Sequence, residues 1–220
     1  MLGVAVVIAS LACGYGYYRL SKPDHPTLYA VPPVTPAATA PASVPDAPPV
    51  ARKIPEQVPD LILPGLDGRA HKLTEWGGRP LLVNFWATWC EPCRREIPLL
   101  KSLRSEHASK RLEIVGIAID HLDPVRKYVT DNRMSYPVLV GERGGFEAAD
   151  AFGMDTVLPF SVFADAAGQI VALKVGELHR DEAELILERI SKLDSGSLSL
   201  EAARQEISAA MPRLAASRAQ

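Results

Sequence analysis

Two cysteines, Cys90 and Cys93, are the residues whose types and spacing most directly indicate chemistry. They follow an apolar segment, residues 81–85, that is typical of a strand, and they open a segment that is typical of a helix. Thiols at positions i and i+3 of a helix share one face and can form a disulfide without movement of the backbone. At the N-terminus of the helix, unpaired amides and the helix dipole would stabilise the Cys90 thiolate. Cys93, one turn further in, suits the role of the resolving thiol.

Other uses of a cysteine pair fit this sequence less well. A zinc site needs two further ligands at close spacing, and the third cysteine, Cys13, lies in an N-terminal apolar segment. Haem attachment would need a histidine after the second cysteine, where Arg94 stands. A structural disulfide stays open as an alternative, although such bridges seldom join residues three apart at a strand-to-helix turn. The pattern favours redox catalysis by a Cys90–Cys93 disulfide, without a metal or another cofactor.

The residues around the two cysteines resemble a known active site. The segment Phe85-Trp86-Ala87-Thr88-Trp89-Cys90-Glu91-Pro92-Cys93, followed by Arg94-Arg95-Glu96 and Pro98, is similar to that of the membrane-anchored thiol–disulfide oxidoreductases of the TlpA, ResA and CcmG type. The resemblance covers roughly residues 58–193. It implies an α/β thioredoxin-like fold, in which a central mixed sheet is flanked by helices.

The hydrophobic pattern predicts elements that fit this fold. It predicts strands at 61–63, 70–73, 81–85, 114–119, 138–140, 161–163 and 170–175, and helices at 91–108, 124–132, 146–152 and 181–193. The first two strands form an N-terminal hairpin, and Pro98 is expected to bend the first helix. The order gives a βαβ unit and a ββα unit with a helix–strand pair inserted between them.

The chain divides into four predicted regions. Residues 1–20 are predicted to be a signal-anchor or a signal peptide, because residues 2–18 are uncharged and apolar, although this stretch is short for a membrane span. Residues 21–57 form a Pro/Ala-rich linker, 58–194 the thioredoxin-like domain and 195–220 a helical extension. Arg19 and Lys22 follow the apolar segment, which by the positive-inside rule would place the rest of the chain in the cytoplasm. Against that signal, we expect an inner-membrane-anchored protein with a periplasmic domain.

The extension carries a helical pattern of its own. Leu200, Ala203, Ile207 and Met211 fall on one face, and Pro212 is expected to end or kink the helix. We expect this face to dock on the domain; contact with a partner and fraying are the alternatives.

The resemblance assigns roles to residues outside the cysteine pair. It implies that Pro159 is a cis-proline beside the cysteines and that the backbone of Leu158 pairs with a substrate chain. It also implies that Glu96, which follows Cys93 by three residues, is a partly buried carboxylate that relays protons to the thiols, rather than a solvated surface charge. In support, Asn84 stands where thioredoxins carry a buried aspartate.

The neighbours of the cysteines are expected to tune the site and to bind substrate. Glu91 and Pro92 separate the two thiols, and the Glu91 carboxylate should disfavour the thiolate, which makes the dithiol a better electron donor. Trp86 and Trp89 are expected to shield the site and to offer an apolar platform for an unfolded peptide. Five other residues are expected at the surface. Arg94 and Arg95 are expected as solvated charges that oppose the effect of the Glu91 charge, and the three histidines, which show no metal-ligand spacing, are His107, His121 and His179.

These observations predict an exported protein-disulfide reductase, in which Cys90 attacks a substrate disulfide and Cys93 resolves the mixed disulfide. The resemblance implies substrates such as apocytochrome c or a protein of cytochrome oxidase assembly, and a membrane thiol carrier as electron donor. A net charge of −2 gives no indication of nucleic-acid binding, and we expect a monomer.

Three other functions fit the same fold. A thiol oxidase or isomerase is the main alternative. A copper chaperone would usually add a third His or Met ligand near the cysteines, and none is evident. A peroxidase would place its cysteine after Pro and Thr or Ser, where Trp89 precedes Cys90.

Overall fold

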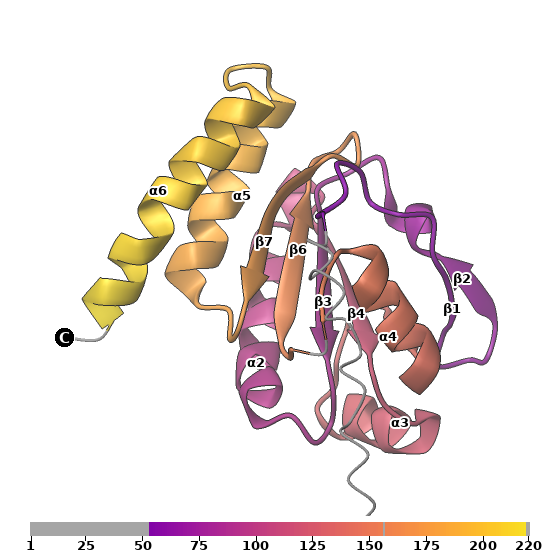
Figure 1. The fold of residues 1–220 in the computed structure, drawn as a ribbon. Helices are drawn as coiled ribbons and strands as arrows, with labels where there is room; N and C mark the ends of the chain where they lie inside the picture. The colour runs from indigo at the N-terminus through magenta and orange to yellow at the C-terminus, as the bar shows by residue number, and fades with distance from the viewer. Residues whose placement is uncertain (1–52, 156, 219–220) are drawn as a thin grey trace, which may run out of the picture. The chain divides into compact units, whose positions relative to one another are not determined.

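The computed structural model describes residues 53–155 and 157–218 (Figure 1). The predicted anchor and all but the last residues of the predicted linker lie outside this range. The described part contains no helix that combines the length and apolar character needed to cross a bilayer.

The centre of the fold is a five-stranded mixed sheet with the order β5-β4-β3-β6-β7, as the thioredoxin-like prediction requires (Figure 1). β3, β4 and β5 are parallel, whereas β6 pairs antiparallel with β3 and β7 pairs antiparallel with β6. The strands are β3 (Leu81–Trp86), β4 (Glu113–Ala118), β5 (Val138–Val140), β6 (Phe160–Ala164) and β7 (Ile170–Val175). A separate antiparallel hairpin, β1 (Ile62–Pro64) and β2 (Ala70–Lys72), confirms the predicted N-terminal hairpin.

Helices cover both faces of the sheet. They are α2 (Glu91–Glu106), α3 (Leu122–Asp131), α4 (Glu142–Ala151), α5 (Arg180–Asp194) and α6 (Leu200–Arg218), with short 3-10 turns η1 (Leu73–Trp76) and η2 (Ala108–Lys110). Because side chains alternate along a strand, Leu82 and Trp86 of β3 pack with α2, α5 and α6, whereas Val83 and Phe85 pack with α4 and the hairpin. Every residue of β3 is buried, which explains why its sequence is apolar at every position except Asn84.

The segment before β1 joins the sheet earlier than the predicted domain start at residue 58. Gln57 forms an isolated bridge with Gln169, and the Ile170 amide donates to the Glu56 carbonyl at 2.9 Å. The last residues of the predicted linker are therefore paired with the start of β7.

The start of α4 differs from the prediction. The helix begins at Glu142 rather than Phe146, and it includes Gly144 and Gly145. A Cβ atom on Gly145 would lie 2.9 Å from the Ile119 side chain, and one on Gly144 would lie 2.9 Å from Leu63. These glycines allow α4 to approach its neighbours closely, so packing overrides their poor helix propensity.

The C-terminal helix docks on the domain, as predicted, and extends further than expected. Ala203 and Ile207 are buried in the same core as α5, and Leu200 and Met211 pack against it. Pro212 was predicted to end or kink the helix, and the first of these outcomes is wrong, since α6 continues to Arg218. In Figure 1, α6 lies beside α5 along the same side of the sheet.

Candidate active site

The loop after β3 delivers the cysteine pair to the first turn of α2. Cys90 is the N-cap of the helix, and its Sγ accepts a hydrogen bond from the Cys93 amide at 3.3 Å. Cys90 and Cys93 are joined by a disulfide, with a Cα–Cα distance of 5.3 Å. Cys93 is fully buried, whereas Cys90 retains 6% exposure. The more accessible sulfur is therefore the one at the helix N-terminus, where a thiolate is stabilised.

A buried aspartate holds this loop in place. Asp120 follows β4, and its Oδ2 accepts hydrogen bonds from the Thr88 amide at 3.0 Å and the Thr88 hydroxyl at 2.5 Å. Its Oδ1 accepts from the His121 amide at 2.7 Å. The sequence does not single out Asp120, although its place is a usable signal, because the carboxyl ends of neighbouring parallel strands meet at one edge of a sheet.

The Asp120→Ala variant is expected to lower the free energy of unfolding by about 2–3 kcal/mol, because the Thr88 amide and hydroxyl lose their acceptor inside the fold. Urea denaturation of the oxidised protein measures this loss. The matched control is Asp131→Ala on α3, where the carboxylate is 54% exposed and a change within about 0.5 kcal/mol is expected. Equal losses in the two variants would contradict the role of Asp120 as an anchor.

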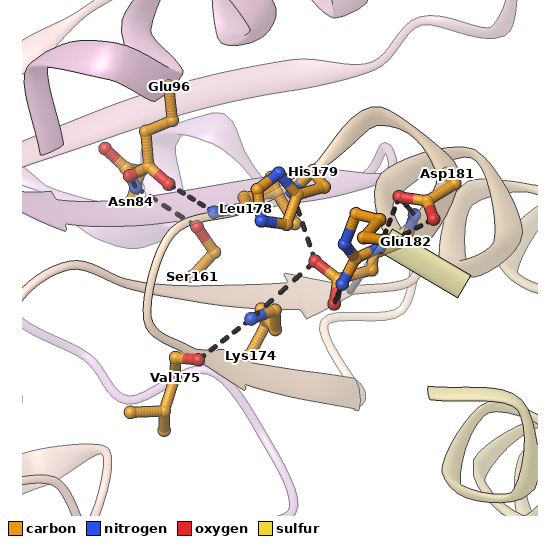
Figure 2. Close-up of polar contacts among 10 residues, drawn as sticks. Asn84, Glu96, Ser161, Lys174, Val175, Leu178, His179, Asp181 and Glu182 are labelled. Carbon is orange, nitrogen blue, oxygen red and sulfur yellow. Dashed lines mark hydrogen bonds and ion pairs between the residues drawn. The ribbon is translucent and has the colours of Figure 1, made fainter. Parts of the chain in front are cut away.

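Glu96 lies one helical turn beyond Cys93 and is more deeply buried than predicted, with 1% exposure. Its Oε1 accepts from the Asn84 side-chain amide at 2.7 Å, and its Oε2 accepts from the Leu178 backbone amide at 2.7 Å (Figure 2). The Asn84 amide also donates to the Ser161 hydroxyl at 3.1 Å. The carboxylate is thus fixed by groups from β3 and from the segment between β7 and α5.

Burial raises the pKa of Glu96 from 4.5 to about 7. The hydrogen bonds from Leu178 and Asn84 oppose this rise, the negative charge of Glu177 adds to it, and the positive charge of Lys174 opposes it. A carboxyl group with a pKa near neutrality can both accept and release a proton under ordinary conditions, as a proton relay requires.

Trp86 does not form part of a binding platform, which corrects one prediction. Its side chain is fully buried, and its ring packs against Tyr128 at a centroid distance of 5.4 Å. It lies on the α2 side of β3, in the same buried cluster as Cys90 and Cys93, so it packs beneath the disulfide as part of the core. Trp89, in contrast, is 66% exposed beside Cys90 and can contact a substrate.

The peptide bond between Leu158 and Pro159 is cis, as the resemblance implied. Phe160, the next residue, pairs with Phe85 of β3, so the register places Pro159 beside the end of β3 from which the cysteine loop departs. The Pro159 carbonyl accepts from the Gly176 amide at 2.9 Å. Exposed apolar side chains flank this position, with Val157 50% and Val175 45% exposed.

The charges on the first turn of α2 are paired. Arg95 binds Glu91 at 3.2 Å and Glu177 at 2.6 Å, so it links the Cys-x-x-Cys dipeptide to the segment after β7. The prediction that Arg95 is a solvated charge is therefore only half right, since the side chain is about half exposed yet forms two ion pairs. The neighbouring arginine neutralises part of the Glu91 charge, which weakens the expected effect of Glu91 on the Cys90 thiolate.

Three histidines, His107, His121 and His179, were predicted to lie at the surface. The prediction of a surface position is wrong for His107, whose side chain is 11% exposed and bonds Glu184 at 3.0 Å. His121 is exposed, and His179 is the N-cap of α5. In residues 53–155 and 157–218, no group of three or more His, Cys, Asp or Glu side chains is arranged to hold a metal ion.

A thioredoxin-like sheet with a Cys-x-x-Cys disulfide at the start of the helix after its central strand defines a thiol–disulfide oxidoreductase. The model of the AhpC/TSA family matches residues 54–173, more than half of the chain, and this chain belongs to that family. It is an enzyme of the ResA-like, thioredoxin-like group.

Individual relatives agree with this assignment. The chain is 29% identical over 133 residues to the thiol-disulfide oxidoreductase ResA of Bacillus thuringiensis subsp. konkukian. The aligned segment covers 60% of this chain and 75% of ResA. A thiol:disulfide interchange protein of the thioredoxin family from Chlorobium tepidum TLS is 30% identical with a TM-score of 0.54, covering 64% of this chain and 96% of that structure. A secreted thiol-disulfide isomerase from Corynebacterium glutamicum is 25% identical with a TM-score of 0.53, covering 58% and 80%.

Proposed function

We propose that this chain is an exported, membrane-tethered protein-disulfide reductase. The observation that carries the proposal is the Glu96 carboxylate, buried and hydrogen-bonded one helical turn from the buried Cys93. A dithiol donates electrons only after its thiols lose protons, and a buried thiol has no direct exchange with water. Glu96 supplies a proton acceptor at that position.

The reaction proceeds in two exchanges. The Cys90 thiolate attacks one sulfur of the substrate disulfide, so that a mixed disulfide forms and the second substrate sulfur leaves as a thiolate. Cys93 then transfers its proton to Glu96, and its thiolate attacks the Cys90 sulfur. The Cys90–Cys93 disulfide forms, the first substrate sulfur leaves as a thiolate, and two electrons have passed to the substrate.

The surface around Cys90 fits a peptide substrate. Trp89, Val157 and Val175 supply exposed apolar area, and the Leu158 backbone beside Pro159 can pair with an extended chain. Glu91 and Pro92 lie in the first turn of α2 next to Cys90. The proposed partners are a disulfide-containing protein, such as an apocytochrome c, and a membrane thiol carrier that returns electrons to the oxidised site.

The export and the membrane tether rest on the apolar segment 1–20 and on the comparison with a secreted relative. The name of that relative also makes an isomerase the second candidate. An isomerase or an oxidase uses the same two thiols, and the reduction potential separates these functions from a reductase.

The test is the reduction potential of the Cys90–Cys93 couple in the full-length protein, measured by equilibration with dithiol–disulfide buffers. A reductase is expected to have a potential near or below that of thioredoxin, about −270 mV. A value near that of a strong disulfide-forming oxidant, about −120 mV, would overturn the proposal and favour a thiol oxidase.

A further inference from the structure

Another buried carboxylate lies beside the segment that binds Glu96. Glu182, in the first turn of α5, is 3% exposed. Its Oε1 binds Arg218 at 2.7 Å, and its Oε2 lies 3.6 Å from the Lys174 Nζ atom (Figure 2). A buried carboxylate is retained at low cost only when cations and hydrogen-bond donors surround it, and both cations are present here.

The same carboxylate fixes the backbone that holds Glu96. The Glu182 Oε2 atom accepts a hydrogen bond from the His179 amide at 3.1 Å. The preceding residue, Leu178, donates its amide to Glu96 at 2.7 Å and buries its side chain in the core. Figure 2 shows the two carboxylates on either side of this short segment. A displacement of His179 would therefore displace the donor that Glu96 uses.

One of the two cations comes from the C-terminal helix. Arg218 lies in the last turn of α6, and it also binds both oxygens of Asp181, at 2.7 and 2.6 Å. The AhpC/TSA match ends at residue 173, so α6 is outside it. The second cation, Lys174, is 20% exposed on β7, and its Nζ donates to the Val175 carbonyl at 3.0 Å.

We propose that Glu182, held by Lys174 and Arg218, positions the Leu178 amide against Glu96, so that the C-terminal helix controls how the active-site carboxylate exchanges protons with the thiols. In this arrangement Glu182, Lys174 and Arg218 are positioning residues, because none of them touches the cysteines. The inference rests on the proposed proton-relay function of Glu96.

The direction of the effect follows from the groups around Glu96. Two hydrogen-bond donors reach it, the Asn84 amide from β3, which also binds Ser161 of β6, and the Leu178 amide. Two charges act on it, the negative charge of Glu177 after β7 and the positive charge of Lys174 on β7. Tyr136 is buried before β5, and its phenol pKa is raised by burial and by the Glu96 charge. Loss of Arg218 leaves the Glu182 charge less balanced and loosens the Leu178 donor. Loss of Lys174 removes a positive charge. Both changes disfavour the ionised form of Glu96, so its pKa is expected to rise.

The experiment follows the Glu96 carboxyl carbon by ¹³C NMR across pH in the full-length oxidised protein, with Glu96→Gln to assign the signal. Arg218→Gln and Lys174→Met are each expected to raise the midpoint of the Glu96 titration by about 0.5 pH units. Arg218→Lys, which keeps the positive charge, is expected to have a midpoint close to that of the parent protein. The matched control is Arg213→Gln, a loss of the same charge at an exposed position of α6, and it is expected to leave the midpoint unchanged.

A second measurement separates the inference from the proposed function. The rate of disulfide reduction by dithiothreitol is recorded across pH for the same variants. If Glu96→Gln changes the pH profile, while Arg218→Gln and Lys174→Met leave both the profile and the NMR midpoint unchanged, the positioning role is overturned and the relay stands. If Glu96→Gln leaves the profile unchanged, the relay itself fails. If Arg218→Gln does not fold, Lys174→Met and Arg218→Lys decide the question by the same two readouts.

Discussion

The Cys93→Ser variant is expected to lose turnover completely and to accumulate a mixed disulfide between Cys90 and its substrate. Cys93 is fully buried behind Cys90, so a substrate sulfur can reach only the outer position. Without the inner thiol, no internal nucleophile is available to release the substrate, and the covalent complex persists. The measurement is non-reducing electrophoresis with mass spectrometry, after the reduced variant is mixed with a disulfide-containing protein.

The matched control is Cys90→Ser, which keeps the buried thiol and removes the accessible one. It is expected to form no adduct, and dithiothreitol is expected to release the substrate from the Cys93→Ser complex. Adducts that form on Cys90→Ser and not on Cys93→Ser would reverse the assignment of the attacking and resolving thiols.

Much of the sheet can be predicted because its central strands are buried on both faces. Residues 81–86 and 113–118 are almost continuously apolar, and such short segments between turn signals admit few other structures. The start of α4 could not be predicted in the same way. Its glycines are poor helix formers in isolation, and they are favourable only because Leu63 and Ile119 come close in the folded chain.

The candidate site also contains features that local sequence predicts and contacts that it does not. Local spacing is enough to predict the cysteine pair, since residues three apart share a helix face, whereas the role of Glu96 is predicted only with the family resemblance. The Leu178 amide that binds Glu96 is 82 positions away, and no local pattern announces it. The burial of Trp86, however, could have been predicted, because strand alternation places it on the same face of β3 as Leu82.

The Glu96→Gln variant is expected to become more stable relative to the parent protein as the pH rises. Burial raises the pKa of Glu96 in the folded state from 4.5 to about 7, so the folded protein binds this proton more tightly than the unfolded chain does. The resulting stability is fully present below pH 4.5, declines as the pH rises, and is lost above about pH 7. The decline amounts to about 3 kcal/mol, and glutamine, which does not titrate, is free of it.

A hydrogen-bond cost acts in the other direction. Glutamine has a single acceptor oxygen, whereas Asn84 and Leu178 both donate to the carboxylate. One of these donors loses its acceptor in the variant, which is expected to cost about 1–3 kcal/mol relative to the ionised form of Glu96. The sign of the net effect at one pH is therefore less informative than its slope. Urea denaturation of the two oxidised proteins between pH 4 and 8 measures this slope.

The same titration should govern the rate. If Glu96 accepts the Cys93 proton, Glu96→Gln is expected to slow disulfide exchange by about 10²-fold and to remove the step in the pH profile near pH 7. The control is Glu147→Gln on α4, where the carboxylate is 65% exposed, and it is expected to change neither the slope of stability nor the rate. A sloped stability difference with an unchanged rate would mean that Glu96 is buried at a cost in stability without taking part in proton transfer. A stability difference that does not change with pH would contradict the raised pKa itself. A Glu96 that binds its proton more tightly in the folded protein than in the unfolded chain must make the stability of the parent protein depend on pH, and glutamine has no such dependence.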